Sequence, residues 1–141
     1  MKNIEPYLIF DGNCEEAFTF YEFVFNVKRR FISRYKDLPD AEKANIPPAD
    51  MNKILHTLLP VSEKVYIMGS DSPVNRKITF GDNVSLTLNA ESEEEAKYLF
   101  EKLSEEGNVT MPLQKTFWAE LYAMITDKFG IHWMINYIPG Q

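Results

Sequence analysis

Two histidines and one late carboxylate are the residues of this chain whose types could support metal or acid–base chemistry. They are His56, His132 and Glu120. Two neutral imidazoles and a carboxylate can bind zinc or iron when they converge. His56 and Glu120 fall in predicted strands of different halves, however, and their spacing does not require convergence. A hydrogen-bonded sheet residue is the favoured interpretation of His56, whereas ligand contact and a plain sheet position are equally open for His132.

Glu120 lies among aromatic residues in a predicted strand. Strand alternation places Trp118, Glu120 and Tyr122 on one face. If that face borders a cavity, a partly desolvated Glu120 could act as a general base. If the face meets water or the rim of a dimer, Glu120 is an ordinary exposed carboxylate, and we favour this second interpretation.

The single cysteine, Cys14, excludes an intrachain disulfide and any CxxC metal site. Its predicted position in the first turn of a helix would favour the thiolate through the helix dipole. No histidine lies near it in the sequence, so a nucleophilic role is not the interpretation that we favour.

Charge and length narrow the class of protein. The 141 residues fit one domain, and 15 Lys and Arg against 21 Asp and Glu give a net charge of −6. The one basic cluster, residues 28–30, is smaller than a nucleic-acid-binding face. No apolar run approaches the length that spans a bilayer, and the first six residues lack the apolar region of a secretion signal. We expect a cytoplasmic protein with no nucleic-acid or membrane partner.

A weak internal repeat organises the predicted elements. Residues 13–16 and 92–95 each begin with a side-chain acceptor and end with Glu, which is typical of a capping box. Apolar residues at helical spacing follow each box, and the two sets are offset by 79 residues. One strand is predicted before each helix and three after it. In the first half the strands span residues 7–10, 30–35, 53–59 and 65–68. In the second half they span residues 84–88, 108–113, 117–126 and 131–137. The pattern predicts an α+β domain of residues 1–141 with two βαβββ modules, about 1–71 and about 83–141.

Two polar, proline-containing segments separate predicted strands. Residues 37–50 contain three of the prolines, and we expect a mobile excursion there. Residues 71–83 join the two halves. Each could border a cavity entrance or a partner contact, although a solvated connector is the favoured interpretation of both.

The order of several motifs resembles PhnB-like proteins. The chain opens with YLIF (7–10) and NCEEAF (13–18), and continues with ILH (54–56), MGSD (68–71) and VSL (84–86). The most specific run is VTMPLQKTFW (109–118), followed by DKFG (127–130) and WMIN (133–136). Some such proteins are labelled demethylubiquinone methyltransferases, but no Gly-rich loop follows a strand here to hold an adenosyl cofactor.

The resemblance implies the vicinal-oxygen-chelate fold, in which two βαβββ modules form curved mixed sheets that enclose a cavity, often completed in a homodimer. Its better-known relatives include glyoxalase I, extradiol dioxygenases, fosfomycin-resistance enzymes and bleomycin-binding proteins. Most of the enzymes hold a divalent metal with His, Gln and Glu side chains, and the metal polarises substrate oxygens.

The metal-ligand positions that the resemblance implies carry few suitable donors here. The last-strand position, four residues after Gly130, is Met134, whose thioether is a soft, neutral donor. The position that opens the second module falls near Asn83. The other two fall near Tyr7, or Glu5 if the register slips, and at Gly69 or Ser70. We therefore expect no metal and no cofactor.

These observations favour a homodimer that binds a small organic molecule in an aromatic-lined cavity without an obligatory metal. One alternative is a lyase, isomerase or dioxygenase with a metal on His56, Glu120 and His132. Others are pure sequestration of a ligand and a paralogue whose own side chains fill the cavity. The expected ligand-binding residues are Tyr7, His56, Ser70, Trp118, Glu120, His132 and Met134.

Overall fold

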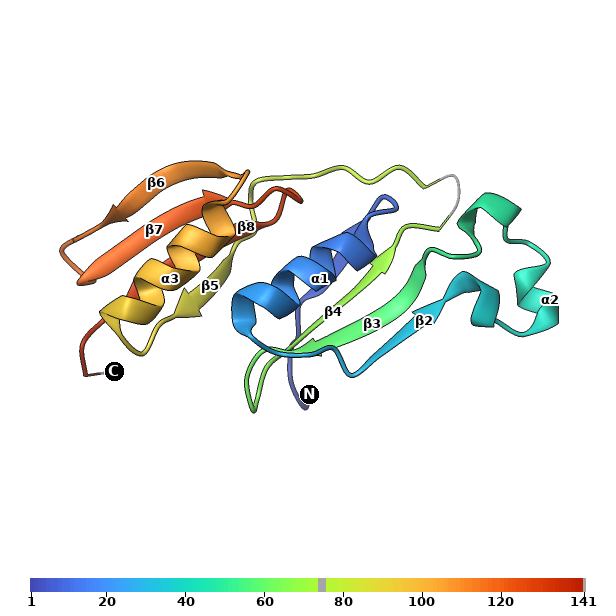
Figure 1. Cartoon of the computed structure of the whole chain (residues 1–141), viewed down its shortest axis with the longest axis horizontal. Helices are drawn as coiled ribbons and strands as arrows, with labels where there is room; N and C mark the ends of the chain where they lie inside the picture. The colour runs from blue at the N-terminus through green and yellow to red at the C-terminus, as the bar shows by residue number, and fades with distance from the viewer. Residues whose placement is uncertain (74–75, 141) are drawn as a thin grey trace. The chain divides into compact units, whose positions relative to one another are not determined.

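The computed structural model describes residues 1–73 and 76–140 (Figure 1). The chain divides into two compact units, Met1–Thr79 and Phe80–Gln141. Both units follow the order βαβββ, and Figure 1 shows one long helix lying against each sheet.

Unit one forms a mixed four-stranded sheet in the order β1-β4-β3-β2. β1 runs parallel to β4, and the other neighbours are antiparallel. Its main elements are β1 (Tyr7–Phe10), α1 (Cys14–Phe25), β2 (Phe31–Arg34), β3 (Ile54–Pro60) and β4 (Tyr66–Asp71).

Unit two repeats this topology in the order β5-β8-β7-β6, with β5 parallel to β8 and the other neighbours antiparallel. Its elements are β5 (Leu86–Asn89), α3 (Glu93–Ser104), β6 (Asn108–Gln114), β7 (Leu121–Thr126) and β8 (His132–Tyr137). The prediction of an α+β fold with two βαβββ modules and mixed sheets is confirmed, and neither sheet closes on itself.

Two predicted strand boundaries in unit two were wrong. The strand predicted at 117–126 begins only at Leu121, because residues 116–119 form a turn. In that turn the Thr116 N–H donates to the Ala119 carbonyl at 3.0 Å, and the Ala119 N–H donates to Thr116 Oγ1 at 3.1 Å. The strand predicted at 84–88 lies at Leu86–Asn89.

The helix caps differ between the units. Asn13 makes no side-chain cap, so the first capping-box prediction was wrong. In its place Asp71 Oδ1, at the end of β4, accepts the Cys14 N–H at 2.9 Å and the Gly12 N–H at 3.0 Å. In unit two Ser92 accepts the Glu95 N–H as predicted, while the Glu95 carboxylate accepts the N–H of Glu91.

The segment between β2 and β3 contains three short helices, η1 (Tyr35–Asp37), α2 (Asp40–Lys43) and η2 (Pro48–Asp50). The Lys36 N–H donates to the Met51 carbonyl at 2.9 Å and so joins the two ends of the segment, and the Tyr35 hydroxyl donates to the Asp71 carbonyl and ties the segment to β4. Of the segment predicted as a mobile excursion, residues 37–50, Asp50 is buried, and Tyr35, which was predicted to end the preceding strand, is buried in η1. The predicted connector 71–83 includes residues 74 and 75, which lie outside the described residues.

Candidate functional site

The two faces of the unit-one sheet can be told apart at Gly69. A Cβ at Gly69 would lie 2.4 Å from Phe18 Cε2 of α1, so this position of β4 faces the helix. Because strand side chains alternate, Met68 and Ser70 face the other way. Tyr7 pairs with Met68 and Ile9 with Ser70, whereas Thr57 of β3 pairs with Gly69. Tyr7, His56 and Ser70 therefore share the face of the sheet that α1 does not cover.

Tyr7 and His56 are in direct contact on this face. Tyr7 Oη lies 3.2 Å from His56 Nδ1, and the two rings are stacked at 5.5 Å with an interplanar angle of 7°. The ring of Phe31, on β2, lies 5.4 Å from that of His56. We call the set of Tyr7, Phe31, His56 and Ser70 the aromatic face. The favoured interpretation of His56 as a hydrogen-bonded sheet residue agrees with this contact.

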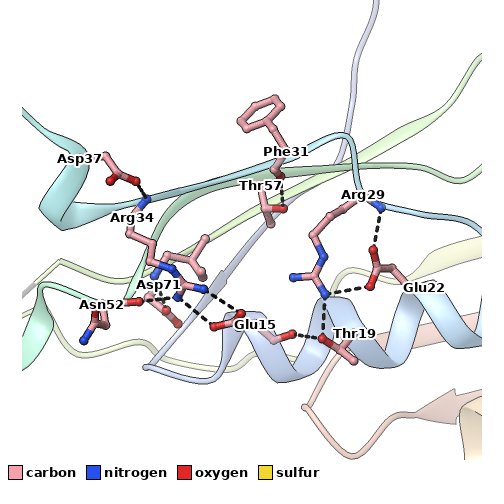
Figure 2. A network of polar contacts seen from close by, with 11 residues as sticks. Glu15, Thr19, Glu22, Arg29, Phe31, Arg34, Asp37, Asn52, Thr57 and Asp71 are labelled. Atoms are coloured by element: carbon pink, nitrogen blue, oxygen red, sulfur yellow. Dashed lines mark hydrogen bonds and ion pairs between the residues drawn. The ribbon is translucent and has the colours of Figure 1, made fainter.

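Phe31 belongs to the aromatic face through its strand position. It pairs with Leu58, two residues beyond His56 in β3. Figure 2 shows its ring on the far side of the strands from α1, while its carbonyl accepts a hydrogen bond from the Thr57 hydroxyl at 2.8 Å. The sequence prediction did not select Phe31. Its position beside His56 depends on how β2 is aligned with β3, and the residues next to Phe31 in the sequence do not specify that alignment.

A polar network on the helix side ties β2 and the loop before it to α1 (Figure 2). Arg34 of β2 donates to both carboxylate oxygens of Glu15, at 2.9 and 2.8 Å, and to the Asn52 carbonyl at 2.7 Å. These hydrogen bonds from Arg34 hold the pKa of Glu15 below its usual value. Arg29 likewise bonds Glu22 at 2.9 Å and lowers the pKa of that carboxyl. The bidentate Arg34–Glu15 contact joins β2 to α1, and the Arg29–Glu22 ion pair joins α1 to the loop before β2.

Cys14 lies on the helix side and is not part of the aromatic face. It is buried, and burial, followed by the nearby Asp71 carboxylate, raises the pKa of its thiol well above the ordinary range. The prediction that the helix dipole would favour the thiolate was therefore wrong, because desolvation outweighs it.

In unit two, the side chains opposite α3 come from alternate positions of β7 and β8. The alternation buries Ala123, Ile125, Trp133 and Ile135, and α3 packs against these two strands with its own buried residues. The half-buried positions between them therefore face away from α3. They include the predicted ligand-binding residues His132 and Met134, together with Tyr122 and Asn136.

Both ring nitrogens of His132 are occupied by the protein. Nδ1 lies 2.8 Å from Thr126 Oγ1, and Nε2 lies 2.8 Å from the Gly81 carbonyl oxygen. Since a carbonyl only accepts, Nε2 carries the proton and Nδ1 accepts from the Thr126 hydroxyl. Of the two alternatives for His132, the plain sheet position is the one that these bonds favour.

Trp118 and Glu120 lie in and next to the turn before β7. The Trp118 ring packs on Tyr122 at 5.2 Å, and Phe117 packs on Trp118 at 4.8 Å. Glu120 forms an ion pair with Lys115 at 3.0 Å and remains partly exposed. This ion pair agrees with the favoured interpretation of Glu120 as an ordinary carboxylate in contact with water.

Asn136 is a further candidate that the sequence prediction did not select. Its Nδ2 donates to Asn89 Oδ1 at 3.0 Å, while its buried Oδ1 has no hydrogen-bond partner within residues 1–73 and 76–140. A buried acceptor without a partner costs about 1–3 kcal/mol. Its alternation with Met134 was readable from the sequence, but its pairing with Asn89 required the register of β5 and β8.

The residues present do not fit the metal site of the wider superfamily. His132 has no free nitrogen, and Met134 offers a thioether that the Thr87 hydroxyl approaches at 3.8 Å. The backbone N–H of Glu120 donates to the Tyr137 carbonyl at one end of the paired strands β7 and β8, whereas His132 pairs with Thr126 at the other end. Six strand positions correspond to roughly 20 Å, too far for one ion. Across the described ranges, no group of three or more His, Cys, Asp or Glu side chains could hold a metal.

Comparisons with known proteins give consistent matches. The family model described as 3-demethylubiquinone-9 3-methyltransferase matches residues 2–136. Protein YjdN of Escherichia coli (strain K12) is 31% identical over 144 residues, covering 98% of this chain and 97% of that protein. Protein PA1353 from Pseudomonas aeruginosa is 38% identical with a TM-score of 0.85, covering 96% and 97% of the two chains.

Two further solved structures connect the motifs with the fold. The PhnB protein from Bacillus cereus is 29% identical with a TM-score of 0.78, covering 96% of this chain and 98% of that one. The fosfomycin resistance protein FosX from Listeria monocytogenes is 10% identical with a TM-score of 0.64, covering 95% and 91%. These matches confirm the PhnB-like resemblance and the vicinal-oxygen-chelate fold, and they establish no specific function. In the part of the chain that the structure describes, no helix is both long and apolar enough to traverse a bilayer.

Proposed function

The chain belongs to the family described as 3-demethylubiquinone-9 3-methyltransferase, a PhnB-like branch of the vicinal-oxygen-chelate superfamily, and from this premise we propose that it binds a small organic molecule on the aromatic face. The binding that we propose uses ring surfaces and hydrogen bonds and needs no metal ion held by the protein.

One observation carries this proposal: the ring cluster of the aromatic face is left partly open. Tyr7 is 44% exposed and Phe31 is 45% exposed, although both belong to a sheet whose other face is packed on α1. Ligand sites combine apolar and aromatic surface with a few placed polar groups. Tyr7 and Phe31 offer the ring surface, and the Tyr7 hydroxyl and His56 imidazole offer the polar groups. Ser70 adds a hydroxyl on the same face.

Two other activities are less well supported. A metal-dependent lyase, isomerase or dioxygenase would need donors that converge, and the occupied nitrogens of His132 and the Lys115 partner of Glu120 argue against that set. Methyl transfer, which the family description names, would need a site for an adenosyl cofactor. Such nucleotide sites favour a Gly-rich loop in a parallel sheet, whereas each sheet here has a single parallel pair.

We also propose a homodimer that functions in the cytoplasm. The turn before β7 presents Phe117 at 97% exposure, with the partly exposed Trp118 in ring contact beside it. Exposed aromatic side chains such as these are typical anchors of protein interfaces. The unpaired Cys14 fits a reducing compartment. Trp118 and Met134 remain proposed ligand contacts in unit two.

The test of binding is a thermal-shift screen of small aromatic acids, alcohols and carbonyl compounds with metal-free protein. At about 100 times its dissociation constant, a ligand specific for the folded state adds roughly 2.7 kcal/mol to its stability. Phe31→Ala is expected to remove most of the shift. The matched control is Phe23→Ala on α1, where the ring is 58% exposed but lies off the aromatic face.

The two variants separate the possible results. A shift that survives Phe31→Ala and disappears in Phe23→Ala would place the site elsewhere and contradict the proposal. Loss of the shift in Phe31→Ala alone, with both variants folded by circular dichroism, supports it. Size-exclusion chromatography with light scattering tests the dimer separately, and a monomeric mass would contradict that part.

A further inference from the structure

The two histidines of the chain differ in what surrounds their nitrogens. His132 has both nitrogens bonded within unit two. His56 Nδ1 shares a hydrogen bond with the Tyr7 hydroxyl, in which either group can be the donor, and no described residue bonds His56 Nε2. The Tyr7 hydroxyl can donate and accept at one oxygen, and no carbonyl fixes the tautomer of His56 as the Gly81 carbonyl fixes that of His132. The contact between Tyr7 and His56 is therefore compatible with either tautomer of the imidazole.

The two tautomers present opposite groups to a bound molecule. When Tyr7 donates to Nδ1, the outer nitrogen Nε2 carries a proton and donates. When Nδ1–H donates to the Tyr7 oxygen, Nε2 offers a lone pair, and the phenol proton is free to be donated to another atom. One hydrogen bond thus links a base at Nε2 with an acid at Tyr7 Oη.

We propose, on the basis of the binding function above, that Tyr7 and His56 form a proton relay that tautomerises the bound molecule. Nε2 takes a proton from one substrate atom, Nδ1 passes its proton to the Tyr7 oxygen, and the Tyr7 O–H bond breaks as its proton moves to a second substrate atom. One proton leaves the substrate and one returns, so no oxidant, reductant or metal is required. The pair ends in the opposite tautomer, which the reverse transfer or exchange with water resets.

The surroundings of the pair define the class of substrate. Phe31 packs against His56 and supplies a half-exposed apolar ring, which favours a flat or aromatic group. The relay needs a proton donor and a proton acceptor on nearby atoms of the same molecule, as in an enol and its ketone. We therefore assign the substrate class as small aromatic or planar keto–enol compounds.

The first test measures the tautomer of His56. Nitrogen-15 spectra of the imidazoles should show two histidines, and His132→Gln identifies the signals of His132. We expect His132 to be a pure Nε2–H tautomer and His56 to be a mixture that shifts toward one tautomer in Tyr7→Phe. A His56 signal that is identical in the wild type and in Tyr7→Phe would overturn the relay.

The second test measures proton transfer with phenylpyruvate as the probe. The conversion of its enol to its ketone is followed by ultraviolet absorbance, and exchange of the carbon-bound hydrogen for deuterium is followed by proton NMR. We expect a rate at least about tenfold above the buffer background, falling to background in both Tyr7→Phe and His56→Gln. Tyr98→Phe, the same chemical change on α3, should keep the wild-type rate.

The binding screen distinguishes failure of the relay from failure of the proposed function. No acceleration by the wild-type protein, or full acceleration in Tyr7→Phe, overturns the relay. If ligands still stabilise the wild type but not Phe31→Ala, the proposed binding function stands without it. If no ligand stabilises the folded protein, the proposed function also fails.

Discussion

Replacement of Asp71 by Asn tests whether one buried carboxylate joins α1, β3 and β4. Oδ1 accepts the N–H groups of Gly12 and Cys14, and Oδ2 accepts the Ile54 N–H at 2.8 Å. The residue is 1% exposed, so water does not compete for these bonds. Asparagine has the same shape, but it removes the charge and replaces one acceptor with a donor.

The size of the effect follows from these three bonds. If the amide oxygen of Asn keeps the Gly12 and Cys14 donors, the amide NH₂ group faces the Ile54 N–H. The Ile54 N–H then loses its partner at a cost of about 1–3 kcal/mol. The other two bonds change from charge-assisted to neutral, with a loss of about 1 kcal/mol each. Removal of a buried charge offsets part of this loss. We expect the free energy of unfolding to fall by about 2–4 kcal/mol.

Urea unfolding measures the free energy, and amide hydrogen exchange locates the change. Exchange should accelerate most at Cys14 and Ile54, the donors to the two oxygens. Asp40→Asn is the matched control, since the Asp40 carboxylate is fully exposed and the variant should unfold like the wild type. If Asp71→Asn also unfolded like the wild type, the assignment of Asp71 as the link between these elements would be refuted.

Two further predictions concern titratable groups of unit one. Arg29 holds the pKa of Glu22 below its usual value of 4.5, so this pair stabilises the fold above about pH 4.5 and is lost as pH falls through the lower folded-state pKa. Glu22→Gln should therefore lower the free energy of unfolding by about 1 kcal/mol at pH 7. Urea unfolding at pH 7 and at acidic pH should show that the difference between the variant and the wild type shrinks in acid, and a difference that stays constant would contradict the pairing. Because burial raises the pKa of Cys14, iodoacetamide should label the native protein at least about tenfold more slowly than the urea-unfolded protein. Mass spectrometry measures the two labelling rates, and equal rates would show that the thiol is accessible in the native protein.

The regular elements were readable from the sequence because their signals are local. Ala17 and Phe20 at helical spacing, for example, predict the buried stripe of α1, and both are buried. The cap of that helix was not readable, since its acceptor, Asp71, lies 57 residues from Cys14. An N-cap prediction considers only neighbouring residues, and it selected the Asn13 side chain as the acceptor. In the structure the distant Asp71 carboxylate is the acceptor instead.

The candidate site was readable in part for a related reason. Tyr7, His56 and Ser70 were selected as ligand-binding residues, and strand pairing brings them to one face. The Tyr7–His56 contact itself spans 49 residues and depends on the strand order β1-β4-β3, which alternation within one strand does not reveal. His132 was harder to interpret, because one of its partners, Gly81, lies in the connector between the predicted modules.

The 79-residue repeat also shows why the chemistry of one unit cannot be transferred to the other. Tyr7 and Leu86 each begin the first strand of their unit and are 79 residues apart, as are Cys14 and Glu93 at the starts of the helices. Tyr7 faces away from α1, whereas Leu86 pairs with the buried Trp133 on the α3 side of its sheet. A change of one residue in strand phase moves every side chain to the opposite face. The helix positions therefore correspond between the units, but the Tyr7–His56 pair has no counterpart at the matching position of unit two, and the proposed relay belongs to unit one alone.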